Sequence, residues 1–188
     1  MLDVRSPYEF AAGHVPGALN VPVEGSSVGT KAGFLLDAEQ PVAIHAASRA
    51  DADTAAARLR AVGLLDLAGF LTAPEATARI EPIGVEELER LVADDAVEVV
   101  DVREKNERDD GFIPGSRNIP YRLVGSYADE LVNGRPVVTV CESGARAGVA
   151  ASVLAAHGVE ARPLLDKGIP DWKARGNAVT TFRRCGSR

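Results

Sequence analysis

The sequence lacks several features that would place it quickly in a class. It has two cysteines in 188 residues, Cys141 and Cys185, which is too few for a disulfide framework. No apolar run approaches the roughly 18 residues that a membrane span needs, and the N-terminus does not have the layout of a signal peptide. We therefore expect a cytoplasmic protein with free thiols and no membrane partner.

An excess of positive charge is also missing. The formal net charge is −6, which argues against a nucleic-acid partner and against an anionic membrane. No histidine or cysteine cluster has the spacing of metal ligands, and no glycine-rich motif of the nucleotide-binding type is present. We therefore predict no metal and no cofactor. The 46% hydrophobic and 26% charged residues are ordinary for a globular protein.

The chain contains an internal repeat. Residues 2–22 align with residues 100–120 without a gap, and residues 41–46 align in the same way with residues 136–141. A repeat of this length indicates two copies of one unit of fewer than about 100 residues. We predict a first domain over residues 1–73, shortened at its N-terminus, and a second over residues 80–188. The first copy starts inside its first strand, so either that domain lacks a helix or Met1 is a trimmed boundary of a longer protein.

Each copy alternates strand and helix patterns. In the second copy we expect helices over 85–92, 104–110, 122–131, 147–156 and 169–175, and strands over 97–102, 137–140 and 161–165. The alternation predicts an α/β fold for both domains, a mostly parallel sheet with helices on both faces. In such sheets the functional site lies outside the carboxyl ends of the strands.

Cys141 stands at that place, directly after the strand expected at 137–140 and before the helix expected at 147–156. Unpaired amides at the helix start, the positive end of the helix dipole and Arg146 all favour the thiolate form of a cysteine there. The thiolate is the nucleophilic form. A cysteine that only fills core space needs neither a glycine-containing turn nor an arginine behind it, so we predict a nucleophile.

Several motifs together resemble the rhodanese family. They are Asp-Val-Arg at a strand end, a Gly-x-x-Pro-Gly turn, Asn-x-Pro, the cysteine with its arginine and helix, and Leu-Asp-Lys-Gly-Ile-Pro-Asp-Trp at residues 165–172. The resemblance covers nearly the whole chain, twice over. It implies a sulfurtransferase that carries a persulfide on Cys141, with a small sulfur donor, such as thiosulfate or a persulfide, and a thiol acceptor as partners. It also implies that the sulfane sulfur is cradled by the backbone amides of Glu142, Ser143, Gly144, Ala145 and Arg146.

The first copy departs from this pattern. Ala46 aligns with Cys141 and Asp51 with Arg146, so we expect the first domain to be non-catalytic. His45 and Ser48 have no visible third partner for a serine–histidine pair. We expect His45 to be a partly buried residue at a strand end.

Other functions stay open. The six-residue spacing from Cys141 to Arg146 favours sulfur over phosphate, because the related phosphatases have a loop one residue longer, and Glu142 would repel a dianion. A cysteine-dependent phosphatase or arsenate reductase is the weaker alternative. The other is a non-catalytic or regulatory module, such as one within a larger metallo-β-lactamase-fold sulfur enzyme. An upstream domain and a second copy of the chain in a homodimer are the macromolecular partners that stay open. Cys185, in a basic tail, could receive sulfur from Cys141, but tail thiols are usually incidental.

Three further side chains complete the expectations for the second copy. We expect Asp101 and Arg103 to form a structural network that holds the loop after their strand. We expect Trp172 to pack in or at the rim of the core.

Overall fold

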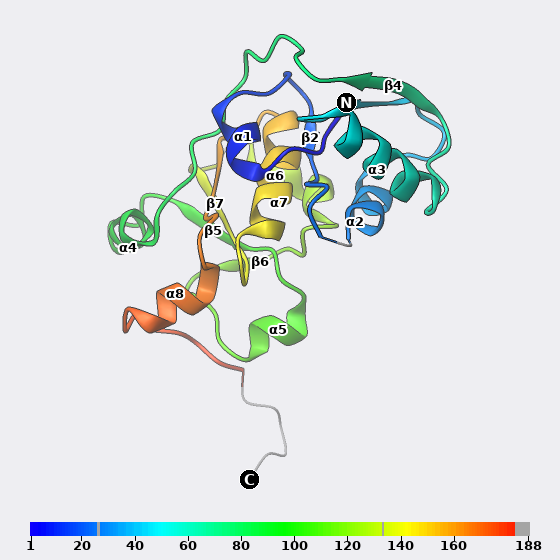
Figure 1. Ribbon diagram of the computed structural model, residues 1–188. Helices are drawn as coiled ribbons and strands as arrows, with labels where there is room; N and C mark the ends of the chain where they lie inside the picture. The colour runs from blue at the N-terminus through cyan, green and yellow to red at the C-terminus, as the bar shows by residue number, and fades with distance from the viewer. Residues whose placement is uncertain (26, 133, 183–188) are drawn as a thin grey trace. The chain divides into compact units, whose positions relative to one another are not determined.

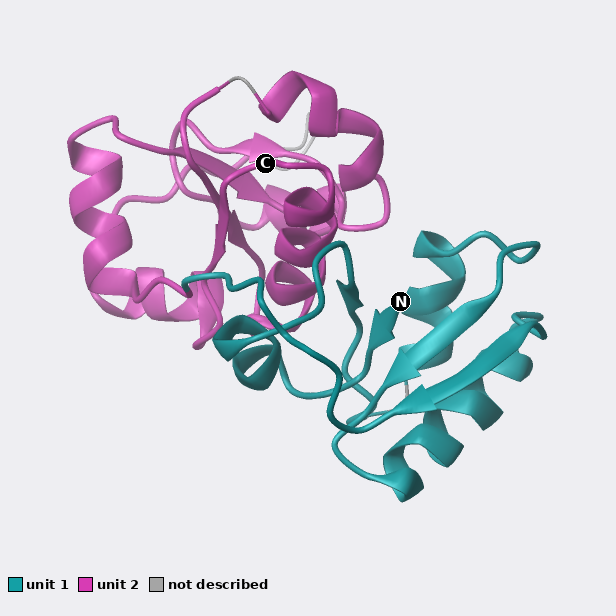
Figure 2. Cartoon of the chain, turned by 90° about the horizontal axis from the view of Figure 1, so that it is seen from above, with its two compact units in different colours: residues 1–81 teal, residues 82–188 magenta. Residues whose placement is uncertain are grey.

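The structure is a computed structural model that describes residues 1–25, 27–132 and 134–182. The chain divides into two compact units, Met1–Glu81 and Pro82–Arg188, which Figure 2 shows in separate colours. Cys185 lies outside the described residues. Within the described part of the chain, no helix combines the length and the apolar character that crossing a bilayer requires.

The first unit is built on a four-stranded parallel sheet. Its strand order is β2-β1-β3-β4, and every neighbouring pair is parallel. In chain order its elements are β1 (Leu2–Asp3), α1 (Pro7–Ala12), β2 (Leu19–Asn20), α2 (Val28–Leu35), β3 (Val42–His45), α3 (Arg49–Arg60) and β4 (Leu67–Leu71). Helices α2 and α3 pack against each other, and α3 packs on β3.

The second unit repeats this plan with more helices (Figure 1). Its sheet has the order β6-β5-β7-β8, again entirely parallel. Its elements are α4 (Val85–Ala93), β5 (Glu98–Asp101), α5 (Lys105–Asp109), β6 (Arg117–Asn118), the 3₁₀ helix η1 (Val124–Tyr127), α6 (Ala128–Leu131), β7 (Val137–Val140), α7 (Ala145–Ala156), β8 (Ala161–Pro163) and α8 (Gly168–Ala174).

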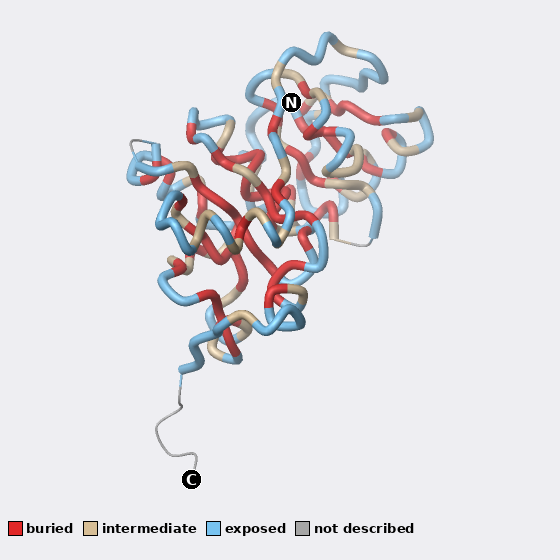
Figure 3. The backbone as a smooth tube through the Cα atoms, turned by 90° about the vertical axis from the view of Figure 1, so that its left-hand side faces the viewer, coloured by how far each residue is buried: buried red, intermediate tan, exposed pale blue. Residues whose placement is uncertain are grey.

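Helices cover both faces of the second sheet. On one face, Leu88 of α4 and Trp172 of α8 join a buried apolar cluster with Val99 of β5 and Val138 and Val140 of β7. On the other face α7 packs on β7 and β8, and its residues 147–154 are all buried. Figure 3 shows how buried and exposed segments are distributed along the whole chain. The predicted fold class, two α/β units of this type, is therefore confirmed.

One predicted helix is wrong. Residues 122–131 do not form a single helix but the 3₁₀ helix η1 followed by the short α6. Gly125 lies within this stretch, and glycine weakens a helix interior because it has much backbone freedom to lose. The amide of Leu123 bonds instead to the carbonyl of Pro120, which makes a turn before η1.

Candidate active site

The loop of residues 141–146, called here the cysteine loop, joins the buried strand β7 to α7. The amide of Gly144 donates a hydrogen bond to Sγ of Cys141 at 3.1 Å. The amides of Glu142, Ser143, Ala145 and Arg146 donate to no described residue. The sulfur therefore already accepts one backbone donor, and further unpaired donors follow it in the loop.

A second loop lies directly on the first. The amide of Ile169 donates to the carbonyl of Cys141 at 2.9 Å, and Gly168 is so close that a Cβ there would lie 2.0 Å from that same carbonyl oxygen. Gly144 of the cysteine loop lies equally close to the second loop, because a Cβ on Gly144 would lie 1.8 Å from the carbonyl oxygen of Leu165. Only glycine fits either position, and both have positive φ angles. The contact buries Cys141 completely.

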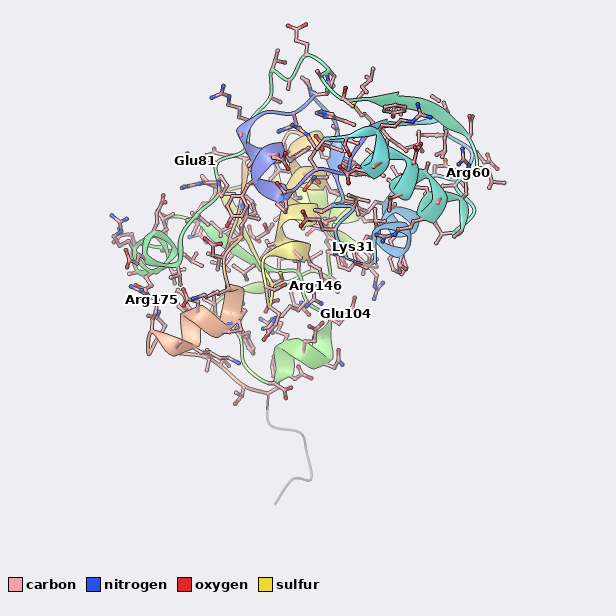
Figure 4. All side chains as sticks on the ribbon, in the orientation of Figure 1. Lys31, Arg60, Glu81, Glu104, Arg146 and Arg175 are labelled. Atoms are coloured by element: carbon pink, nitrogen blue, oxygen red, sulfur yellow. The ribbon has the colours of Figure 1, made fainter. Side chains whose placement is uncertain are left out.

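Arg146 does not stand as a free charge beside the sulfur. Its guanidinium donates two hydrogen bonds of 2.6 Å to the carboxylate of Glu107 on α5. These hydrogen bonds raise the pKa of Arg146, and the charges of Glu107 and Cys141 raise it further. Figure 4 labels Arg146 at the start of α7. The positive charge that we expected Arg146 to place beside the sulfur is therefore partly neutralised by the carboxylate of Glu107.

The expected Asp101–Arg103 network is confirmed. Arg103 is 2% exposed and donates to both oxygens of Asp101, with the shortest bond at 2.7 Å. It also donates to the carbonyl of Gly111 at 2.8 Å and lies 3.4 Å from the carboxylate of Glu142. Arg103 thus holds the loop after β5 and partly offsets the negative charge next to Cys141.

An open cavity of about 520 Å³ borders the cysteine loop. Its lining residues are Glu142, Ser143, Lys167, Pro170, Asp171 and Ala174. Cys141 itself is covered, but its two following neighbours form one side of the cavity.

The first unit presents a different chemistry at the equivalent place. Ala46 follows β3 and is fully buried, and Ser48 caps α3 with its hydroxyl 2.6 Å from the carboxylate of Asp51. His45 is more buried than expected, at 2% exposed, and its Nδ1 lies 2.9 Å from the carboxylate of Asp3. Ser48 is therefore a helix cap that pairs with Asp51 and not with His45.

Two residues near the loop were not among the expected site residues, Glu107 and Lys167. The repeat contained a signal for the first, because Glu9 occupies the aligned position in the first copy. Lys167 lies within the motif at residues 165–172, but the motif alone gave it no role. Trp172 lies in the core as expected, 4% exposed, with its Nε1 bonded to the carbonyl of Ala178.

A small parallel α/β unit with a cysteine loop between a central strand and a buried helix defines the class of protein. The family model described as "Rhodanese-like domain" matches residues 1–73 and 84–175. The chain therefore belongs to the rhodanese-like family and contains its domain twice.

Curated relatives extend this finding. YqhL of Bacillus subtilis (strain 168) is 35% identical over 75 residues, which are 40% of this chain and 60% of that protein. The putative sulfur carrier protein YrkF of the same organism is 29% identical over 102 residues, 54% of this chain and 55% of that one. The chain thus spans less than two thirds of these two relatives. The thiosulfate:glutathione sulfurtransferase of Saccharomyces cerevisiae is 29% identical over 117 residues, 53% of this chain and 82% of the yeast protein.

Among solved structures, the rhodanese-related protein of Thermoplasma volcanium has a TM-score of 0.50 and 26% identity. The alignment covers 54% of this chain and 99% of that one, which is one domain against one domain.

Proposed function

We propose that the second unit is a cytoplasmic sulfurtransferase that carries sulfane sulfur as a persulfide on Cys141. The observation that carries the proposal is the 3.1 Å hydrogen bond from the amide of Gly144 to Sγ, in a loop whose other amides have no described partner. The loop amides of Glu142, Ser143, Ala145 and Arg146 would hold the second sulfur. Membership of the rhodanese-like family and the name of the yeast relative support the same reaction.

The proposed reaction has two steps. In the first, the Cys141 thiolate attacks the sulfane sulfur of the donor, and the donor's other fragment leaves with the electrons of the broken bond. With thiosulfate the leaving group is sulfite, and with an organic persulfide it is a thiolate. In the second step an acceptor thiolate attacks the outer sulfur and returns Cys141 to its thiolate, which makes the route ping-pong.

The local charges favour sulfur over phosphate. Glu142 lies next to Cys141 and is half exposed, and Arg146 is already paired with Glu107. A phosphate dianion needs an available cation at the loop, and it would meet the carboxylate of Glu142 instead. The phosphatase and arsenate reductase alternatives therefore lose their main support.

For the first unit we propose a non-catalytic role. Ala46, which aligns with Cys141, has no nucleophilic side chain. Asp51 places a carboxylate at the position that aligns with Arg146 of the second unit. A negative charge there opposes both a thiolate and an anionic donor.

The test is intact mass after incubation with thiosulfate and, separately, with glutathione persulfide. The wild type should gain the mass of one sulfur, lose it on addition of a thiol acceptor, and gain none when Cys141→Ser is tested. Cys185→Ser is the matched control and should gain sulfur as the wild type does. If neither donor adds sulfur to the wild type, the transferase proposal fails and the regulatory-module alternative is favoured. If the adduct is lost only in Cys185→Ser, the sulfur is carried by Cys185 and not by Cys141.

A further inference from the structure

We propose that the cavity beside the cysteine loop selects a zwitterionic amino-acid or short-peptide persulfide as the sulfur donor. Its carboxylate would bind Lys167 and its ammonium group Asp171. This inference rests on the proposed function, because it names the donor class of that same site. Binding by both charges would favour such persulfides over thiosulfate, which carries only negative charge.

Three arginines around the cysteine loop are already paired with carboxylates. Arg103 is bonded to Asp101, Arg146 to Glu107, and Arg122 to Glu104. Each of these guanidinium groups therefore already has its carboxylate.

Lys167 differs from these arginines. Within residues 1–25, 27–132 and 134–182, its ammonium group has no ion-pair partner, and it lines the cavity. It is the cation at this cavity that can meet the negative group of a ligand.

The wall of the cavity also carries a carboxylate that can meet the positive group of a ligand. Asp171 lines the same cavity, one helical turn after Lys167, and its carboxylate likewise has no ion-pair partner among the described residues. The two side chains do not pair with each other. One unpaired cation and one unpaired anion on the wall of a cavity are complementary to a ligand that carries both charges, as the α-amino-acid group does.

The backbone at Lys167 gives an independent reason. Its φ is +47°, in the left-handed region, and Asp95 is the one other described non-glycine residue with a positive φ. Glycine adopts this conformation without steric cost, whereas a residue with a Cβ is strained there. A non-glycine residue in this conformation is an outlier of the kind that gathers at functional sites, which agrees with a binding role for the Lys167 side chain.

The size of the cavity agrees with a donor larger than thiosulfate. Its volume of about 520 Å³ lies within the range of roughly 300–1,000 Å³ typical of sites for small organic ligands. A five-atom dianion would leave most of that space empty. It would also lie close to the carboxylates of Glu142 and Asp171, which repel it.

The chemical step balances for this donor. The Cys141 thiolate attacks the outer sulfur of the donor's R–S–SH group, and a new S–S bond forms to Cys141 as the donor's S–S bond breaks. The products are the Cys141 persulfide and the thiolate R–S⁻, which takes the bonding electrons. Neither an oxidant nor a reductant is required.

The experiment measures single-turnover charging of Cys141 by quenched intact mass over a range of donor concentrations. The donors are cysteine persulfide, glutathione persulfide, the uncharged 2-hydroxyethyl persulfide and thiosulfate. Comparing the first two identifies whether a single amino acid or a peptide is preferred. The proteins are wild type, Lys167→Gln, Lys167→Gly, Asp171→Asn and Lys173→Gln, the last being a matched control on α8 that does not line the cavity.

We expect Lys167→Gln and Asp171→Asn to raise the half-saturating concentration of the two zwitterionic donors by about three- to tenfold, as expected for loss of one hydrogen bond of typical net strength at the open wall of a cavity. The maximal rate should not change, and neither should any value for 2-hydroxyethyl persulfide. Lys167→Gly should show the same loss of selectivity with a melting temperature no lower than that of the wild type, which separates a binding role from a structural one. Lys173→Gln should behave as the wild type.

Two outcomes would overturn the inference. If the Lys167 and Asp171 variants charge as the wild type does with every donor, or lose all donors equally, the cavity does not select zwitterions, although sulfur transfer by Cys141 stands. If no donor charges wild-type Cys141, the proposed function fails and the donor assignment fails with it.

Discussion

Arg146 binds Glu107 through two parallel hydrogen bonds of 2.6 Å, so the arginine at the start of α7 is anchored to α5. The pKa of Glu107 is lowered, chiefly by these hydrogen bonds from Arg146. The same pairing decides how much positive charge the sulfur of Cys141 experiences.

The first prediction follows from that pairing. Glu107→Gln removes the competing carboxylate and leaves the full charge of Arg146 to favour the thiolate. The rate at which a persulfide donor charges Cys141 at neutral pH, followed by quenched intact mass, should rise by about three- to tenfold. Glu104→Gln is the control, because its partner Arg122 is surface-exposed, and it should leave the charging rate unchanged. A slower rate in Glu107→Gln would show instead that Glu107 holds Arg146 in the position where it acts on the sulfur.

The second prediction concerns the contact between the two loops. Gly144→Ala places a Cβ 1.8 Å from the carbonyl oxygen of Leu165 at a φ of +85°, so either the backbone moves or the loops separate. We expect a loss of roughly 3–5 kcal/mol in the free energy of unfolding, within the range of severe core disruptions.

Gly158→Ala supplies the matched control for that variant. Its φ is +80°, but no heavy atom lies within 4 Å of the added Cβ. Only the left-handed conformation is penalised there, at about 1–2 kcal/mol. Denaturant titration of both variants gives the comparison, and equal losses would mean that the loops are not in close contact.

The sheet and the position of the cysteine could be predicted from the sequence because both depend on local patterns. The valine-rich run at 137–140 and the small apolar residues after Arg146 specify β7 and α7 directly. The internal repeat then extended the same α/β plan to both units, but the order of the strands was seen only in the structure.

The surroundings of the sulfur could not be predicted in this way. The burial of Cys141 depends on Gly168, which is 27 positions further along the chain. The partner of Arg146 lies on another helix. Such contacts depend on how distant segments pack, which composition and periodicity do not report. The helix predicted over residues 122–131 was wrong for a different reason. Gly125 lowers the helix propensity of this stretch, although several of its neighbours favour a helix.

The third prediction concerns the buried ion pair of the second unit. Asp101→Ala leaves Arg103, 2% exposed, without its carboxylate, and an unpaired buried charge costs about 3–5 kcal/mol. Chemical denaturation should show this loss. Asp53→Ala breaks the exposed pair with Arg49 and should change the stability by no more than about 0.5 kcal/mol. A small loss in Asp101→Ala would mean that Glu142 or water compensates the arginine.

The fourth prediction concerns the response of the first unit to acid. Burial lowers the pKa of His14 and His45 below the usual value of 6.5, and for His45 it outweighs the opposing effect of Asp3. Both side chains are therefore neutral in the folded unit, while the unfolded chain binds a proton on each below about pH 6.5. Their contribution to stability is complete above that pH and is lost as the pH falls toward the folded-state values, by up to about 1.4 kcal/mol per pH unit for each histidine.

Hydrogen exchange resolved to peptides measures this effect for each unit separately. Amides of β1 and β3 should lose protection between pH 6.5 and 5, by more than the intrinsic change in exchange rate. Replacing both His14 and His45 with Gln should flatten that dependence, whereas His157→Gln, an exposed residue of the second unit, should leave it as in the wild type. If the double variant keeps the wild-type slope, groups other than these two histidines control the acid response.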